Sequence, residues 1–344
     1  MRAQDEKYIR LALALAEKAK GLTSPNPCVG AVVVKNNRII GRGYHRHAGG
    51  PHAEIYALRQ AGGKAKGATL YVSLEPCRHY GRTPPCVDAI VSAGIKRVVA
   101  AMKDPNPLNY GKGIAALKRR GIKTDVGILE KRAGQLNEAF IKYITKKMPF
   151  VTVKVAQSLD GKIASRTGDS KWISGPKARE FVHRLRSRVD AIIVGSRTVL
   201  KDDPLLTARI KGRNVKQPLR VILCGGSKIP SSARLLSSRG GEVILAKARK
   251  AGRVDIRSLL KDLAKRGVTN VLIEGGGEVI ASAFEAKVVD KVCFFISPKI
   301  IGGRQAVTSV EGIGVDKVSK AIEIKDAAVR KLGGDFMIEG YVRN

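Results

Sequence analysis

Hydrophobic and polar positions follow two different periods along the chain, and the order of these periods predicts an α/β protein. Residues 1–20 repeat their apolar positions at a helical spacing, which indicates an amphipathic first helix. Alternating segments on either side of Asn36-Asn37 predict a β-hairpin, because this pair suits a two-residue turn. Further elements are predicted in the order helix, strand, helix and strand over residues 53–62, 68–76, 86–94 and 96–102. The resulting β-β-α-β-α-β order predicts a mixed sheet covered by helices.

The pattern restarts at residues 146–150, where we predict the boundary between two domains. A strand at residues 150–156 opens the second half, and helices and strands alternate again beyond it. The helices are predicted at 178–189, 255–267 and 278–286, and the strands at 190–195, 219–224, 241–248, 270–274 and 291–297. At 344 residues the chain is too long for one ordinary domain. We therefore predict two different α/β domains, residues 1–146 and 147–344.

Composition narrows the class of protein. The sequence is 44% hydrophobic, yet it has no apolar run near the ~20 residues that a membrane span needs, so we expect no membrane partner. The N-terminus lacks the cleavage pattern of a secretory signal, and we expect a cytoplasmic protein. The five cysteines are odd in number and widely spread. This argues against a disulfide framework and favours a use in metal binding or catalysis.

The charge of the chain is strongly positive, at +35 from 64 Lys+Arg and 29 Asp+Glu residues. Such a surplus attracts polyanions and speeds the capture of phosphorylated ligands. It is spread evenly, because residues 1–148 hold 27 basic and 10 acidic residues and the remainder holds 37 and 19. The sequence has no basic arm and no basic stripe interleaved with aromatics. We therefore predict a generally basic surface and no specific nucleic-acid partner.

Three short motifs bring together the residue types of a catalytic zinc site. They are His-Ala-Glu at 52–54, Glu-Pro-Cys at 75–77 and Pro-Pro-Cys at 84–86, placed at a helix start, a strand end and the next helix start. Zinc binds imidazole and thiolate, and a catalytic zinc keeps its fourth position for water. We therefore predict His52, Cys77 and Cys86 as ligands. Glu54 is too close to His52 to bind the same ion easily and is predicted to move the proton of the bound water, as in zinc deaminases.

The spacing of the two cysteines informs the choice of substrate. Either cysteine alone would be interpreted as a small buried residue, but the three motifs in this order favour the metal site. Eight residues separate Cys77 from Cys86, whereas two separate the cysteines of the P-C-x-x-C signature of nucleobase deaminases. The insert carries Arg78, His79 and Arg82. An enlarged basic loop beside the zinc suits a small anionic substrate.

At these residues the chain resembles a known family. The segments SPNPCVGAVVV, GGPHAE, LEPCRHYGRTPPC and DPNPL are similar to the deaminase half of the bifunctional riboflavin-biosynthesis deaminase–reductases. The segments KVAQSLDGKIA, TGDSKWIS, DAIIVGSRTVLKDDPLLTAR and IEGGGEVI are similar to their reductase half, so the resemblance covers roughly residues 5–305. The chain departs from the family at Arg78, where Ser is usual, and at Asn109-Tyr110. The resemblance implies a cytidine-deaminase-like three-layer domain followed by a dihydrofolate-reductase-like α/β domain.

A run of three glycines marks the second half. Residues 273–277 predict a strand that enters these glycines before a helix, and backbone N–H groups at such a turn can cradle phosphate. Taken alone, the run is better explained as a plain tight turn. The resemblance implies instead that it holds the phosphate end of NADPH. The implied cofactor residues are Gly276, Gly277, Glu278, Val279, Ile280, Ala281 and Ser282, with Ala156, Trp172, Thr198 and Asp202 lining the rest of the site.

The resemblance also implies a substrate site in the second half. Its residues are Ser170, Arg186, Leu206, Arg209 and Glu274. The two arginines suit this role, because a guanidinium pairs bidentately with phosphate. We predict His45, His47 and His183 as surface residues. Asp160 is equally well explained as a turn-forming residue.

The resemblance implies two consecutive steps of riboflavin synthesis. The first removes the 2-amino group of a diaminopyrimidinone that carries a phosphoribosylamino chain, with zinc as cofactor. The second reduces the ribosyl unit to a ribityl chain with NADPH. Two alternatives stay open: a nucleic-acid-editing zinc deaminase with an accessory domain, and a chain that retains only one of the two activities. We expect a phosphorylated pyrimidine as substrate and a homo-oligomer, either a dimer or a tetramer.

Overall fold

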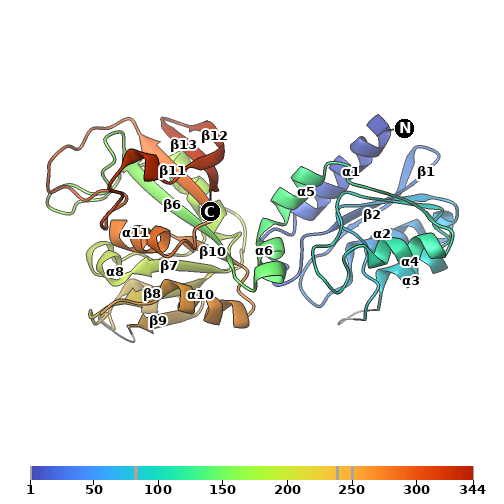
Figure 1. Cartoon of the computed structure of the whole chain (residues 1–344), viewed down its shortest axis with the longest axis horizontal. Helices are drawn as coiled ribbons and strands as arrows, with labels where there is room; N and C mark the ends of the chain where they lie inside the picture. The colour runs from blue at the N-terminus through green and yellow to red at the C-terminus, as the bar shows by residue number, and fades with distance from the viewer. Residues whose placement is uncertain (1, 81–83, 238–239, 249–251, 344) are drawn as a thin grey trace. The chain divides into compact units, whose positions relative to one another are not determined.

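The structure is a computed structural model that describes residues 2–80, 84–237, 240–248 and 252–343 (Figure 1). The chain forms two compact units, Met1–Lys147 and Met148–Asn344, and each contains a β-sheet of its own. Within the described ranges, every helix is too short or too polar to cross a bilayer.

A five-stranded mixed sheet forms the centre of the first unit. Its strands are β1 (Gly30–Lys35), β2 (Arg38–Tyr44), β3 (Thr69–Val72), β4 (Arg97–Ala100) and β5 (Lys123–Val126). They lie in the order β2-β1-β3-β4-β5, with β1 antiparallel to both neighbours and β3, β4 and β5 parallel. The hairpin between β1 and β2 turns at Asn36 and Asn37, whose φ angles of 48° and 61° suit a type I′ turn. The predicted hairpin is therefore present.

Six helices and one 3-10 turn accompany this sheet among the described residues. They are α1 (Arg2–Glu17), α2 (Ala53–Ala61), η1 (Gly62–Ala65), α3 (Cys86–Ser92), α4 (Lys112–Arg119), α5 (Glu130–Leu136) and α6 (Glu138–Lys146). Helix α2 lies so close to β2 that a side chain at Gly41 or Gly43 would clash. A Cβ at these positions would come within 2.1 Å of the Ala57 carbonyl oxygen and 2.5 Å of the Ala53 carbonyl oxygen. The two glycines therefore fix the first turn of α2 above the sheet, and this turn carries the His-Ala-Glu motif.

An eight-stranded sheet forms the centre of the second unit. Its strands are β6 (Phe150–Ser158), β7 (Ala191–Gly195), β8 (Leu219–Cys224), β9 (Val243–Lys247), β10 (Asn270–Ile273), β11 (Lys291–Ser297), β12 (Ile324–Leu332) and β13 (Asp335–Val342). They lie in the order β12-β13-β11-β6-β10-β7-β8-β9. The six strands from β11 to β9 in this order are parallel, and β12 and β13 join antiparallel at one edge.

The helices of the second unit connect its parallel strands. They are α7 (Pro176–Arg186), α8 (Ser196–Asp202), α9 (Arg234–Ser237), α10 (Ile256–Lys265) and α11 (Gly277–Glu285), with a 3-10 turn η2 (Val318–Lys320). Helix α8 follows directly on β7, and α11 follows β10 after the glycine run. In open parallel sheets the segments that follow the carboxyl ends of strands form the ligand crevice. The fold therefore directs both segments to the same edge of the sheet.

Several elements differ from those that the sequence predicted. Strand β3 ends at Val72, well before the predicted end at 76, because its ladder partner β4 offers only four residues. The sequence pattern also missed α4, β5, α5, α6, α8, α9 and the β12–β13 hairpin. Strand β12 is exposed along almost its whole length, so it lacks the alternation of buried and polar positions that marks a strand.

Candidate active sites

Three candidate metal ligands converge in the first unit. Nδ1 of His52 lies 3.1 Å from Sγ of Cys86 and 3.5 Å from Sγ of Cys77, and the three ligand atoms lie within 4.8 Å of one another. One imidazole and two thiols at this separation suit a tetrahedral zinc site with an open fourth position. Over the described ranges, this is the one such group of three or more His, Cys, Asp or Glu side chains.

Two of the three ligands lie at helix starts, as the sequence predicted. His52 is the N-cap of α2, and Cys86 is the first residue of α3. The third ligand differs, because Cys77 lies in the loop beyond β3 rather than at the strand end. The hydrogen bond from Cys86 lowers the pKa of Cys77 to about 4, and the resulting thiolate is the form that zinc binds.

A buried carboxylate holds the loop that carries Cys77. Glu75 Oε2 accepts hydrogen bonds from the backbone N–H groups of Asp104 at 3.0 Å and Gly111 at 2.9 Å, and its Oε1 accepts one from Ile114 at 3.0 Å. These three bonds anchor the Glu-Pro-Cys motif to the segment from Asp104 to Ile114. The sequence analysis treated Glu75 only as part of the motif and missed this role.

Asn109, where the sequence departs from the family pattern, supports the same loop. Its side chain is fully buried, accepts from the backbone N–H of Arg78 at 3.1 Å and donates to Asp104 Oδ2 at 3.2 Å. The departure is therefore compatible with the metal site. Arg82, the third basic residue of the insert, lies outside the described residues.

The environment of Glu54 fits a zinc ion held by these ligands. The Glu54 side chain is buried, and its Oε2 lacks a hydrogen-bond partner among the described residues. An unpaired buried oxygen is costly, and a water at the open position of a zinc site would satisfy it. Burial raises the pKa of Glu54. A raised pKa suits a carboxylate that must take up and return a proton near neutral pH.

A cavity of about 330 Å³ adjoins the candidate ligands, and Asn26, His45, His79 and Asp104 contribute to its wall. The prediction of His45 as a surface residue is wrong. This side chain is 2% exposed, its Nε2 lies 3.2 Å from Nδ2 of Asn26, and its ring packs edge-on against His52. Burial therefore lowers the pKa of His45. His47 is exposed, as predicted.

A second cavity, of about 550 Å³, lies in the second unit at the carboxyl ends of β7 and β8 and at the start of α11. Its wall includes eight residues that the sequence analysis assigned to cofactor or substrate. They are Ser170, Thr198, Asp202, Gly276, Gly277, Glu278, Val279 and Ser282. A Cβ at Gly277 would lie 2.6 Å from the Thr308 carbonyl oxygen, so close packing requires glycine there. The cavity thus offers a helix N-terminus and glycine backbone to a phosphate, which fits the predicted NADPH.

The other predicted cofactor residues lie away from this wall. Ile280 and Ala281 are buried in the core, so their side chains cannot reach a ligand. Ala156 packs against the buried cluster that contains Phe295. Trp172 is 64% exposed, with the Arg179 guanidinium 4.6 Å from its ring centroid. A core role for the single tryptophan is therefore excluded, and its ring is available for stacking.

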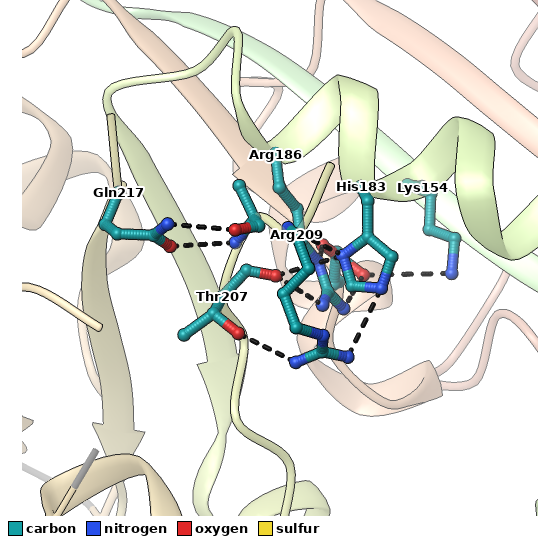
Figure 2. Close-up of polar contacts among 8 residues, drawn as sticks. Lys154, His183, Arg186, Thr207, Arg209 and Gln217 are labelled. Carbon is teal, nitrogen blue, oxygen red and sulfur yellow. Dashed lines mark hydrogen bonds and ion pairs between the residues drawn. The ribbon is translucent and has the colours of Figure 1, made fainter. Parts of the chain in front are cut away.

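Two predicted substrate residues form a buried ion pair (Figure 2). Arg186 donates from Nε to Glu274 Oε1 at 2.7 Å and from Nη2 to Oε2 at 2.9 Å. Lys154, which the sequence analysis missed, lies 3.7 Å from the same carboxylate. Burial alone would raise the pKa of Glu274, but Arg186 and Lys154 lower it to about 2. In this structure the Arg186 guanidinium is paired with Glu274. The sequence analysis had expected the same guanidinium to bind the substrate phosphate.

The remaining predicted arginine is more accessible. Arg209 is exposed, and it donates from Nη1 to Thr207 Oγ1 at 2.8 Å, while its Nη2 lies 3.2 Å from Nε2 of His183 (Figure 2). Leu206, which precedes Thr207, is buried with a φ of 53°. The prediction of His183 as a surface residue is wrong, because helix α7 places this side chain, half-buried, against the 207–209 segment.

Asp160 has a structural role. Its carboxylate accepts hydrogen bonds from Ser158 Oγ at 2.6 Å and from the backbone N–H groups of Ile301 and Gly302 at 3.1 Å and 2.7 Å. The bond from Ser158, followed by the two backbone bonds, lowers the pKa of Asp160 to about 2. The side chain thus ties the end of β6 to the segment after β11.

Comparison with known proteins assigns both units. Residues 2–102 match the cytidine and deoxycytidylate deaminase zinc-binding region, and residues 149–338 match the RibD C-terminal domain. The chain is 44% identical to the riboflavin biosynthesis protein RibD of Aquifex aeolicus and 37% identical to that of Escherichia coli. The alignments cover 98% of both chains in the first case, and 97% of this chain and 98% of the relative in the second. The chain belongs to the RibD family.

Solved RibD structures share the fold of the whole chain. The Acinetobacter baumannii RibD structure superposes with a TM-score of 0.92 at 37% identity and covers 100% of both chains. The structure of a diaminohydroxyphosphoribosylaminopyrimidine deaminase/5-amino-6-(5-phosphoribosylamino)uracil reductase from Thermotoga maritima gives a TM-score of 0.89 at 39% identity and covers 99% of both chains. The predicted fold classes and the predicted bifunctional deaminase and reductase of riboflavin biosynthesis are confirmed. Zinc and NADPH are the cofactors of such an enzyme, as predicted.

Proposed function

We propose that the first unit deaminates a 2,5-diamino-6-(5-phosphoribosylamino)pyrimidin-4-one and that the second unit reduces the ribosyl chain of the product. The Thermotoga maritima relative is a diaminohydroxyphosphoribosylaminopyrimidine deaminase and 5-amino-6-(5-phosphoribosylamino)uracil reductase. The observation that carries the proposal here is the convergence of His52, Cys77 and Cys86 beside a cavity lined by Glu54, whose Oε2 has no hydrogen-bond partner among the described residues.

The residues of the first unit supply proton transfer and enclosure. Zinc, when bound, is the Lewis acid that lowers the pKa of a water so that it can attack the ring carbon bearing the amino group. Glu54 takes up a proton of this water and returns it to the amino group, which leaves as ammonia while the carbon becomes a carbonyl. Its buried position excludes bulk water, and its raised pKa keeps the carboxylate basic enough to accept the proton.

The residues of the second unit position the sugar against the cofactor. NADPH, when bound, supplies the hydride that reduces the sugar carbon. We propose that the cavity wall at Gly276, Gly277 and the start of α11 holds the cofactor phosphates, and that Arg209 binds the substrate phosphate. Arg209 is preferred to Arg186 because the Arg186 fork already pairs with Glu274. The Arg186–Glu274 pair then serves as a rigid wall of the substrate site.

Product masses test the proposal directly. The purified protein is incubated with the pyrimidine substrate, with and without NADPH, and the products are analysed by mass spectrometry. Without NADPH we expect the mass change that replaces an amino group by an oxo group. With NADPH we expect a further gain of one hydride and one proton. Only one of these changes would mean that the chain retains a single activity, and neither change would refute the assignment of the substrate.

We further propose that the second unit associates with a second copy of itself through its exposed apolar edge. Ile313 is 98% exposed, Val318 is 91% exposed and Val329, on the outer strand β12, is 65% exposed. The exposed apolar side chains of the edge strand and its neighbouring loop are costly to leave in water, and the edge offers an open ladder to a partner, although β12 also carries the charged residues Lys325, Asp326, Arg330 and Lys331. Sedimentation should give a larger species for the wild type than for Val329→Lys. The matched change Ile39→Lys, on edge strand β2 of the first unit, should leave the species unchanged.

Location in the cytoplasm stays a prediction.

A further inference from the structure

A histidine outside the predicted substrate set lies between the two elements that form the reductase's candidate phosphate site. His183 is on α7, three residues before Arg186, and its imidazole faces the segment that carries Thr207 and Arg209 (Figure 2). Nδ1 lies 3.1 Å from the Thr207 carbonyl oxygen, and Nε2 lies 3.2 Å from Nη2 of Arg209. We propose that His183, as a neutral imidazole, is a positioning residue that holds the Arg209 guanidinium toward the substrate phosphate. The proposal rests on the proposed function of Arg209.

Two of the three polar neighbours of the ring, the Thr207 carbonyl and the Arg209 guanidinium, require the same tautomer. A guanidinium has only donors, so Nε2 must accept a hydrogen bond from Arg209. The Thr207 carbonyl oxygen has only lone pairs, so Nδ1 must carry the proton that it accepts. The backbone N–H of Arg209 also points at Nδ1 from 3.3 Å and is the one neighbour that favours the other tautomer. That tautomer would place a proton on Nε2 against the donor Nη2 of Arg209 and would leave the Thr207 carbonyl oxygen without a donor from the ring. The ring is therefore fixed at both ends in one orientation.

The same contacts hold Arg209 from two sides. Its Nη1 donates to Thr207 Oγ1 at 2.8 Å, and its Nη2 donates to His183. The Thr207 carbonyl that His183 engages also accepts a bond from Nη1 of Arg186 at 3.3 Å, so the segment is tied to α7 twice. Two of the five N–H donors of Arg209 are thereby used, and the others remain for a phosphate. An arginine already held in position loses less conformational entropy when it binds its ligand.

Protonation of His183 would undo this arrangement. A second ring proton turns Nε2 into a donor that faces the donor Nη2 of Arg209, and it adds a positive charge near two cations. The charged groups that act on the ring are Arg186 on α7, Arg209 on the facing segment and Glu274 after β10, and Lys154 on β6 contacts the same Glu274 carboxylate. Burial, followed by the charges of Arg186 and Arg209, lowers the pKa of His183, so the ring is neutral at neutral pH.

The test compares the deaminated intermediate with its dephosphorylated form as substrates of the reductase in the full-length enzyme with NADPH. The measured quantity is the ratio of kcat/KM for the phosphorylated form to that for the dephosphorylated form. His183→Leu should lower this ratio by roughly tenfold, mainly through KM, in line with one charge-assisted hydrogen bond. His183→Gln, which offers an acceptor near the position of Nε2, should restore most of the ratio. Arg184→Leu removes an exposed cation of the same helix and should leave the ratio unchanged.

Two reference variants separate the possible failures. Arg209→Leu should lower the ratio more than His183→Leu, and adding His183→Leu to it should lower the ratio no further, because the histidine acts through the arginine. Two outcomes would refute the positioning role of His183 while leaving the proposed phosphate contact of Arg209 intact. In the first, Arg209→Leu lowers the ratio and His183→Leu does not. In the second, His183→Leu slows both substrates equally. If Arg209→Leu leaves the ratio unchanged, the proposed phosphate contact is refuted together with it.

A pH series provides the second readout. The KM of the wild type for the phosphorylated substrate should rise in acid more than the KM of His183→Gln, because only the wild type gains a charge beside Arg209. The substrate phosphate itself gains a proton near pH ~6, and the comparison with the variant cancels that contribution. Parallel pH profiles of the two enzymes would refute the requirement for a neutral imidazole.

Discussion

Glu274→Gln should destabilise the second unit strongly, although the substitution keeps the shape of the side chain. Only 6% of the Glu274 side chain is exposed, and its carboxylate meets the Arg186 fork at 2.7 Å and 2.9 Å, with Lys154 at 3.7 Å. An amide leaves these two cations facing each other, with 14% and 15% of their side chains exposed. Removing one partner of a buried ion pair typically costs ~3–5 kcal/mol of unfolding free energy.

The lowered pKa of Glu274 expresses the same contribution as a dependence of stability on pH. It is lowered from its ordinary value of 4.5 to about 2. One pKa unit corresponds to about 1.4 kcal/mol, so the charged contacts stabilise the fold by roughly 3 kcal/mol at neutral pH. Because the folded-state pKa is depressed, this contribution is present above pH ~4.5 and is lost as the pH falls toward ~2. The difference between wild type and variant should therefore shrink over that pH range.

Denaturant unfolding monitored by tryptophan fluorescence is the appropriate assay. Trp172 is the only tryptophan of the sequence and lies in the second unit, so its emission reports the unfolding of that unit. Glu180→Gln is the matched control, because Glu180 forms an exposed ion pair with Arg184 on helix α7. Solvent screens that pair, so its loss should have little effect on stability. A loss in Glu274→Gln no larger than in Glu180→Gln, or one that does not change with pH, would refute the reasoning.

Three further predictions concern the metal site, the two units and the charge. Glu54→Gln should keep the zinc and slow deamination by ~10²–10⁴-fold, whereas Cys86→Ser should lose zinc in elemental analysis. Metal loss in Glu54→Gln would assign Glu54 to the ligands. A fragment that begins near Lys146 should fold and oxidise NADPH in the presence of the deaminated substrate, because each unit has its own sheet and core. A fragment that remains unfolded would contradict this boundary. Single-stranded DNA and tRNA should bind weakly and with strong salt dependence, and sequence-selective binding or base deamination would contradict an even, unspecific positive surface.

The sequence was sufficient for the elements and residues that act through local motifs. Asn36-Asn37 specifies its hairpin because the turn needs only two residues with positive φ. His52 and Cys86 were predicted correctly as helix-start residues, since the motif and the start of the helix lie within the same few positions. The glycines at 276 and 277 were assigned to the cofactor only through the family resemblance, because the strand, glycine run and helix around them suit a plain tight turn better when taken alone.

The sequence was not sufficient where a residue's role depends on a segment far away in the chain. His45 and His183 were both predicted at the surface, yet one packs against His52 and the other against Arg209. Lys154 and Glu274 are 120 positions apart, and only the pairing of β6 with β10 brings them together. The pairing of Arg186 with Glu274 also depends on a distant segment. The sequence shows the guanidinium but does not show which carboxylate will lie beside it.

Local sequence therefore determined which chemistry this protein can perform, whereas the tertiary structure determined which groups are charged, paired or free to bind. Motifs depend on backbone geometry over a few residues, and the order of residue types within those few positions determines this geometry. Burial and ion pairing are set by the packing of strands and helices from distant parts of the chain, and these contacts shift the pKa of Glu54, His183 and Glu274. The zinc site belongs largely to the first kind of information, and the reductase substrate site belongs to the second.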